Sequence, residues 1–136
     1  MATPANSVLD ASALLAYLQG ELGANVVAST LVQGAVISSI NWAETLSKLA
    51  ERGQDPDDVT NQLVSQGLLN NVLHIHSVDE ELACTIAKLR LPTQSIGLSL
   101  GDRACLALAI HLQLPAFTSD RIWTTLNLGI VINPIR

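Results

Sequence analysis

The sequence has few of the side chains with which proteins usually bind nucleic acids. Lys and Arg together number 7 in 136 residues, and aromatic residues make up 3% of the chain. So few scattered cations exclude a broad basic face for phosphate groups. So few aromatics exclude an extended platform for stacking bases. If the protein acts on an anion, the positive charge must come from elsewhere, and a bound metal ion is the first candidate.

Cysteines and long hydrophobic segments are also scarce. Cys84 and Cys105 lack the paired or His-flanked spacing of a zinc site, and we expect both to be buried, reduced thiols. No apolar run approaches the roughly 20 residues of a membrane span. The opening residues carry no signal-peptide pattern. These features predict a cytoplasmic protein with no membrane association.

Length and composition favour a single domain over residues 1–136, because the chain is 49% hydrophobic and of ordinary domain size. Short apolar runs alternate with helical patterns. The predicted strands are 7–9, 35–38, 72–76, 116–118 and 130–132. The predicted helices are 12–19, 24–33, 41–52, 55–69, 78–91, 100–112 and a short one at 121–128, with a loop at 92–97. This alternation is typical of an α/β fold with a mostly parallel sheet of four to five short strands.

Four acidic residues fall where such a fold forms its sites. Asp10 ends the first predicted strand, and Asp120 follows the fourth. Glu44 lies in the helix after the second strand, and Asp102 lies in the first turn of the most apolar helix. Ligands of open α/β sheets bind at the carboxyl ends of the strands. Four carboxylates there would repel one another unless cations neutralised them, and oxygen ligands suit Mg²⁺ or Mn²⁺.

Each acid also has a structural interpretation as a helix cap. Asp10 and Asp120 precede helices, Glu44 lies three residues after Asn41, and Asp102 lies three residues after Ser99. A cap requires one polar residue, which Ser or Asn also supplies. Acids at all four places therefore favour a metal site over capping alone.

The segments around these acids resemble the PIN domain family, and within it the VapC-type ribonuclease toxins of type II toxin–antitoxin pairs. The matching segments are VLDASALL at 8–15, NWAE at 41–44, LSLGDRACLALA at 98–109 and TSDRIW at 118–123. They occur in the family's order and with similar spacing. The resemblance implies a three-layer α/β/α sandwich.

The resemblance also implies an activity and a site. The activity is that of a metal-dependent endoribonuclease, which hydrolyses RNA phosphodiester bonds with a metal-activated water. Asp10, Glu44, Asp102 and Asp120 match the family's catalytic, metal-binding acids, which hold one or two Mg²⁺ or Mn²⁺ ions. Ser12 and Thr118 match its supporting hydroxyl positions.

The sequence differs from the resembled family at Arg103, where a small residue is expected after the aspartate, and Arg121 directly follows Asp120. Arg103 and Arg121 are candidate contacts to substrate phosphate. The alternatives are a surface ion pair for Arg103 and a solvated helix position for Arg121. The implied partners are a small antitoxin bound over the acidic site and a second copy of the chain in a homodimer.

Two other functions compete with the nuclease hypothesis. A non-catalytic PIN-fold interaction module would keep the shape, although a pure scaffold has no reason to bear four repelling acids. A phosphoaspartate receiver-like domain requires a lysine after a late strand. The chain's lysines, Lys48 and Lys88, both lie on predicted helices, which argues against a receiver.

Overall fold

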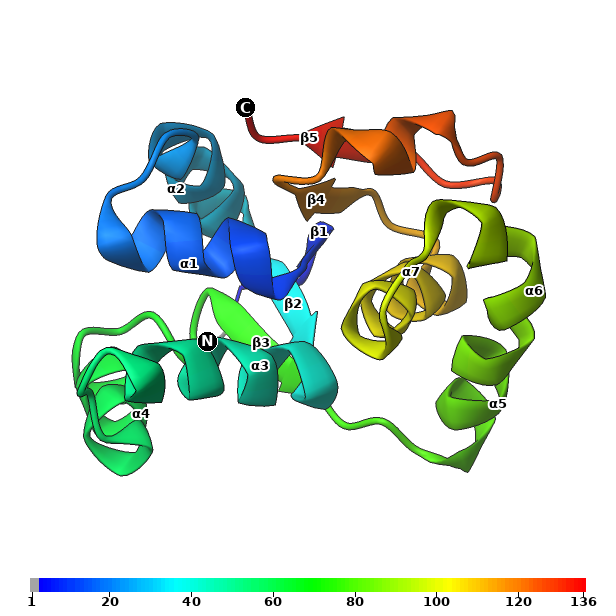
Figure 1. Ribbon diagram of the computed structural model, residues 1–136. Coiled ribbons are helices and arrows are strands. Elements are labelled where there is room, and N and C mark those ends of the chain that lie inside the picture. Colours follow the sequence, from blue (N-terminus) through cyan, green and yellow to red (C-terminus); the bar gives the residue numbers. More distant parts are fainter. Residues whose placement is uncertain (1–2) are drawn as a thin grey trace.

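A computed structural model describes residues 3–136 and shows a central sheet flanked by helices (Figure 1). Met1 and Ala2, which the predicted domain includes, lie outside the described residues. The sheet has five strands in the order β3-β2-β1-β4-β5, and every neighbouring pair is parallel. The strands are β1 (Ser7–Leu9), β2 (Ala35–Ser38), β3 (Leu73–His76), β4 (Ala116–Thr118) and β5 (Ile132–Pro134). The predicted α/β class with a parallel sheet is confirmed.

The helices form two groups, one on each face of the sheet. The first group is α1 (Ala11–Gln19), α2 (Ala24–Gln33), α3 (Ser39–Glu51) and α4 (Pro56–Ser65). The second is α5 (Glu80–Lys88), the short α6 (Arg90–Thr93) and α7 (Leu100–Leu112). Two 3₁₀ helices, η1 (Gln94–Ile96) and η2 (Arg121–Thr125), complete the elements. Figure 1 shows α1 and α2 on the opposite side of the strands from α5 to α7.

Alternation along the central strands gives the molecule two hydrophobic cores. Leu9 and Ile37 pack with residues of α1 to α4, whereas Val8 and Val36 pack with residues of α5 and α7. Successive side chains of a strand point to opposite faces, so strands covered on both faces consist of apolar residues throughout. This is the three-layer α/β/α arrangement.

The order of the strands reverses direction at β1. From β1 the chain moves outward to β2 and β3, and it then returns to add β4 and β5 on the other side of β1. The carboxyl ends of β1 and β4 are adjacent, and the backbone N–H of Asp10 donates to the carbonyl of Phe117 at 3.1 Å. Such a switch point is where open α/β sheets bind ligands.

Several predicted boundaries are wrong. The last strand was expected at 130–132 but is β5, Ile132–Pro134. Its register is set by β4, which pairs Ala116 with Ile132, and Val131 is 63% exposed before the strand begins. The expected loop at 92–97 contains α6 and η1. Pro92 lies in the first turn of α6, where a missing N–H breaks no helical hydrogen bond.

The starts and ends of other helices also differ from expectation. Helix α3 begins at Ser39 with Ser38 as its N-cap, three residues before Asn41. Helix α5 is capped by Asp79, whose side chain accepts from the backbone N–H of Leu82, so the predicted start near Ser77 is too early. Helix α4 ends at Ser65, and η2 ends at Thr125, both earlier than predicted.

The two cysteines differ in exposure. Cys105 is buried in α7, as predicted, but Cys84 is exposed on α5, so the prediction that both are buried is wrong. The reason is that α5 packs against α7 with one face only, through Leu82 and Ile86, which leaves its other face exposed. In residues 3–136, no helix has both the length and the apolar character needed to cross a membrane.

The thiols therefore provide a test of the fold. A water-soluble thiol reagent should modify Cys84 rapidly in the native protein and Cys105 only after denaturation, since Cys105 is fully buried. Absorbance of the released chromophore measures both phases. Cys84→Ser should remove the fast phase and leave the slow one. Two fast-reacting thiols in the native protein would contradict the packing of α7.

Candidate active site

Asp10 is the acid at the centre of the site. It follows β1 directly and is 6% exposed, so its carboxylate is buried at the edge of the sheet. Its Oδ1 accepts from the hydroxyl of Ser12 at 2.7 Å and from the backbone N–H of Ala13 at 2.8 Å. Its Oδ2 accepts from the hydroxyl of Thr118 at 2.6 Å. Asp10 is therefore both the N-cap of α1 and a fixed anion between β1 and β4.

The two predicted supporting hydroxyls connect Asp10 to the loop after β4. The backbone N–H of Ser119 donates to Ser12 Oγ at 3.0 Å, and that of Asp120 donates to Thr118 Oγ1 at 3.0 Å. Thr118 is fully buried, and Asp120 is exposed. Asp120 also caps η2, because its Oδ1 accepts from the backbone N–H of Ile122 at 3.1 Å. The positions of Ser12 and Thr118 thus agree with a supporting role.

Glu44 and Asp102 approach from helices on opposite faces of the sheet. Asp102 forms a capping box with Ser99 at the start of α7, and its Oδ2 accepts from the backbone N–H of Ser99 at 2.9 Å. Glu44 lies in the second turn of α3, too far from the N-cap Ser38 to act as the cap residue considered above. Its Oε1 accepts from Asn41 Nδ2 at 3.2 Å. Capping therefore accounts for the other three acids but not for Glu44.

The acids lie at one edge of the sheet, but their carboxylates do not converge on a single position. The charge of Asp102 acts on Asp10, and the charges of Asp10, Asp102 and Glu44 all act on the Cys105 thiol. Over the described part of the chain, no three His, Cys, Asp or Glu side chains are close enough as they stand to hold a metal ion together. Repulsion between uncompensated carboxylates favours this open arrangement.

Burial changes the protonation of two groups at this edge. Burial, with a smaller contribution from the charge of Asp102, raises the pKa of Asp10 from its ordinary 3.8 to about 6, even though the bonds from Thr118, Ala13 and Ser12 lower it. No cationic side chain is among the groups that shift this pKa. Burial and the charges of Asp10, Asp102 and Glu44 also raise the pKa of Cys105 well above 9.0. At neutral pH, Asp10 is a buried anion with no cationic partner among residues 3–136.

The donor set of this edge fits a divalent ion that prefers oxygen ligands. Among the described residues, no hydrogen bond reaches Oε2 of Glu44, Oδ1 of Asp102 or Oδ2 of Asp120. On Asp10, Oδ2 accepts one bond and keeps a second acceptor position. Carboxylate oxygens at one edge, with a buried anion among them, suit Mg²⁺ or Mn²⁺ rather than a softer metal.

Neither arginine singled out in the sequence joins the acids. Arg103 is 8% exposed, and its Nη1 donates to the carbonyl of Ile86 at 3.0 Å, near the end of α5. This burial contradicts the interpretation of Arg103 as a surface ion pair, and its contact to substrate phosphate stays a prediction. Its long side chain belongs to the packing of α7 against α5. Arg121 is exposed, and its Nη1 donates to the carbonyl of Arg136 at 2.6 Å.

Two residues of the site were missed in the sequence. Asn41 was considered only as a helix cap, but its side chain contacts both Glu44 and the backbone of α7 at Gly101. Gly101 lies directly against the Glu44 carboxylate. Gly101 could have been recognised in the sequence as a glycine in the first turn of a predicted helix. Alanine is a better helix former than glycine by about 1 kcal/mol, so a glycine there suggests a steric constraint.

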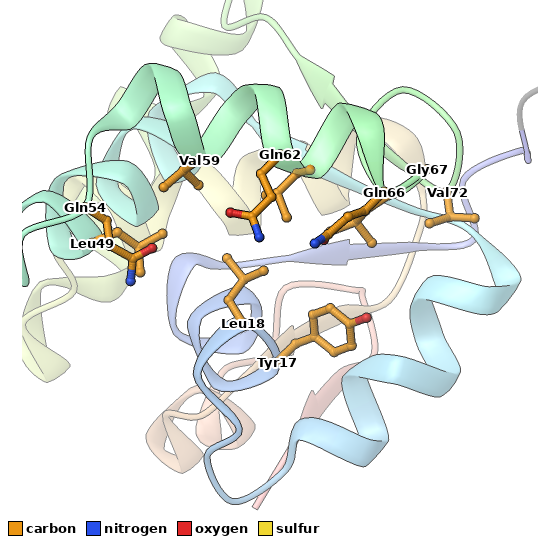
Figure 2. Close-up of a pocket in the computed structure, with 11 residues that line it drawn as sticks. Tyr17, Leu18, Leu49, Gln54, Val59, Gln62, Gln66, Gly67 and Val72 are labelled. Carbon is orange, nitrogen blue, oxygen red and sulfur yellow. The ribbon is translucent and has the colours of Figure 1, made fainter.

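A cavity lies away from the acids. It has a volume of about 590 Å³ and is bounded by α1, the end of α3, α4 and the turn after α4. Figure 2 shows Gln62 of α4 and Leu18 of α1 facing each other across it. Tyr17 is the one titratable side chain among its lining residues. It therefore lacks the groups for acid–base or metal chemistry, and the acidic edge remains the candidate active site.

Comparison with known families identifies the fold. The family profile of the PIN domain matches residues 7–127, a range that contains all four acids. This chain is a PIN domain protein. The match extends from the start of β1 past η2, so the PIN domain accounts for most of the chain.

Solved structures of similar shape agree with this assignment. A toxin–antitoxin complex from Klebsiella pneumoniae contains a chain with a TM-score of 0.71 and 20% identity, covering 96% of this PIN domain protein and 98% of that chain. VapC20 of Mycobacterium tuberculosis, described as a sarcin–ricin loop cleaving toxin, has a TM-score of 0.68 and 14% identity. This match covers 88% of the present protein and 93% of VapC20. A chain of the DNA-bound VapBC complex from Salmonella typhimurium has a TM-score of 0.69 and 18% identity, and the match covers 98% of this protein and 100% of that chain. No curated protein sequence matches the chain.

Asp10 should make the stability of the metal-free PIN domain depend on pH. Its folded-state pKa of about 6 lies above the unfolded value of 3.8. The folded state therefore binds this proton more tightly, and stability falls as the pH rises from about 4 through about 6. The shift corresponds to roughly 3 kcal/mol in the free energy of unfolding. Urea unfolding in the presence of a chelator measures it.

The matched variant is Asp10→Asn, which keeps the size of the side chain and removes the charge. It should be more stable than the wild type above about pH 6 and similar to it below about pH 4, because only the ionised form of Asp10 is destabilised by burial. A stability difference that stays constant across this range would show that Asp10 is not the group responsible.

Proposed function

We propose that this protein is a metal-dependent endoribonuclease that hydrolyses RNA phosphodiester bonds with Mg²⁺ or Mn²⁺, and that it is the toxin of a type II toxin–antitoxin pair. The observation that carries the proposal is the buried Asp10 carboxylate, which lies at the switch point of the sheet with no cation to compensate it. Glu44 and Asp102 add further negative charge at the same edge. A structural cap alone does not require this concentration of charge.

Each residue of the edge has a role that follows from its contacts. Asp10 would hold the ion from its fixed position, and Ser12 and Thr118 keep its carboxylate oriented. Glu44, Asp102 and Asp120 would contribute the oxygens that accept no hydrogen bond within the described chain. A bound divalent ion supplies the positive charge that the chain lacks and lowers the pKa of a coordinated water toward neutrality. The site would take one or two such ions.

The arrangement at the edge also argues against a covalent mechanism through Cys105. This thiol lies near three of the acids, but it is fully buried and its pKa is raised well above the usual value. A cysteine nucleophile needs an accessible thiolate. Cys105 therefore stays protonated and serves as packing beneath the acids, and hydrolysis by water remains the chemistry that the residues support.

The proposed partners rest on the structural neighbours and on charge. Solved structures of this shape include toxin–antitoxin and VapBC complexes, and one neighbour is described as an RNA-cleaving toxin. We expect a small antitoxin to cover the acidic edge with a cationic side chain, since opposite charges there favour a specific partner. We also expect a homodimer and a cytoplasmic location.

The nuclease hypothesis predicts RNA cleavage that depends on Mg²⁺ or Mn²⁺ and stops when a chelator is added. Asp10→Asn should lower the rate at least about 100-fold, because the carboxylate that anchors the ion loses its charge. Gel analysis of a defined RNA with purified protein measures the rate, and circular dichroism checks that the variant is folded.

A matched control is Asp57→Asn, which also removes one carboxylate but lies exposed in the first turn of α4. It should cleave at the wild-type rate. Equal cleavage by wild type and Asp10→Asn would point to a contaminating nuclease. No cleavage by the wild type with either ion, on any of several RNA classes, would favour the non-catalytic interaction module.

RNA binding outside the acidic edge should depend only weakly on salt. Four of the 12 acidic residues are assigned to the site. The rest of the chain then has 8 acidic and 7 basic residues, so it carries no excess of positive charge. For single strands, the slope of log affinity against log salt is about −0.7 per phosphate contacted. A slope between about 0 and −1.5 is expected from fluorescence anisotropy, and a slope of about −4 or steeper would indicate a basic surface that this account lacks.

A further inference from the structure

Glu44 approaches the backbone of α7 so closely that a methyl group at position 101 would displace the Glu44 carboxylate. A methyl group on Gly101 would lie 2.7 Å from Glu44 Oε1 and 3.1 Å from its Cδ. Gly101 is the second residue of α7 and does not have a positive φ, so its backbone conformation does not itself require glycine. Alanine is the better helix former. The space taken by the Glu44 carboxylate is therefore the feature that explains glycine at this position.

Asn41 fixes the same carboxylate from the other side. Its amide is 1% exposed, and Nδ2 donates both to Glu44 Oε1 at 3.2 Å and to the carbonyl of Gly101 at 2.9 Å. Oδ1 accepts from the hydroxyl of Ser38 at 2.6 Å. The carbonyl of Gly101 and the carboxylate of Glu44 can only accept, so the amide nitrogen of Asn41 faces them and Oδ1 faces the Ser38 hydroxyl. The network thus determines which end of the amide faces Glu44.

We propose that Asn41 and Gly101 form a seat for the Glu44 carboxylate and thereby set the affinity of the acidic edge for a divalent ion. This inference rests on the proposed function, because it assigns Glu44 to an ion. Asn41 contacts one oxygen of Glu44 and leaves Oε2 without a hydrogen bond from the described residues. Asn41 is a positioning residue: it acts on the ion through Glu44.

A simpler role for Asn41 is to join α3 to α7 through the carbonyl of Gly101. Loss of that buried hydrogen bond would lower stability by itself. The two roles differ in what happens when Glu44 is absent. If Asn41 acts through Glu44, its removal has no further effect on ion affinity in a chain without Glu44. If it acts only on the packing of the helices, the two losses multiply.

The test is a double-mutant cycle on Mn²⁺ affinity, measured by calorimetry on the full chain without RNA. Asn41→Ala should weaken binding about 10- to 100-fold, the range typical of residues that orient metal ligands. Glu44→Ala should weaken it at least as much. The double variant should match Glu44→Ala within about two-fold, which is the usual limit of additivity.

The matched control is Thr45→Val. Thr45 is fully buried on the same helix, and its hydroxyl donates to the Asn41 carbonyl at 2.8 Å, so this variant also removes a buried hydrogen bond but leaves the seat intact. It should lose stability and keep the wild-type Mn²⁺ affinity. An equal loss of affinity in Thr45→Val would show that general loosening of α3 is the cause and would overturn the inference.

Gly101→Ala changes the seat from the side of α7 and leaves the side chain of Asn41 in place. It should also weaken Mn²⁺ binding about 10- to 100-fold. It should have no effect on Mn²⁺ binding in the Glu44→Ala background, where the three atoms nearest to the added methyl, all from the Glu44 carboxyl group, are absent. If Asn41→Ala does not fold, the cycle with Gly101→Ala is sufficient to test the proposal. The seat is contradicted if Gly101→Ala binds Mn²⁺ as tightly as the wild type. It is also contradicted if, in either cycle, the double variant loses affinity by the product of the two single losses. The proposed function would remain in both cases. A wild type that binds no Mn²⁺ at millimolar concentration overturns both.

Discussion

The structure depends on one buried anion, the Asp10 carboxylate at the end of the central strand. Bonds from Ser12, Ala13 and Thr118 hold it in place and join the start of α1 to the end of β4. These bonds only partly offset the effect of burial, because the pKa of Asp10 is still raised to about 6. The fold thus keeps a charge in a position where it lowers stability unless a cation is supplied. Active sites are where such groups gather.

Capping and ion binding use the same carboxylates here, so the two interpretations of the acids do not exclude each other. Asp10, Asp102 and Asp120 each cap a helix with one oxygen. The bond made by the cap fixes the carboxylate, and on Asp102 and Asp120 the second oxygen accepts no hydrogen bond from the described chain. Glu44 lies within a helix and caps nothing, which explains why its position requires a separate device from Asn41 and Gly101.

Most of the fold could be predicted from the sequence, whereas the metal-binding role of the four acids stays a prediction, and the failures have physical causes. Strands covered on both faces, such as β1 and β2, are continuous apolar runs and are easily recognised. The last strand was misplaced because its position depends on pairing with β4, a long-range contact that hydrophobicity does not encode. Arg103 was misjudged because a long side chain can bury its stem and still find a backbone carbonyl. The role of Asn41 requires knowing that α3 and α7 meet.

The most direct test of the central claim is the effect of Mn²⁺ on the thermal unfolding of wild type and Asp10→Asn at a pH above the Asp10 pKa. If an ion compensates the buried charge, the melting temperature of the wild type should rise by several degrees, since a ligand at about 100 times its Kd adds about 2.7 kcal/mol of stability. Asp10→Asn should show little or no rise. Equal shifts in both proteins, or none in either, would contradict the account.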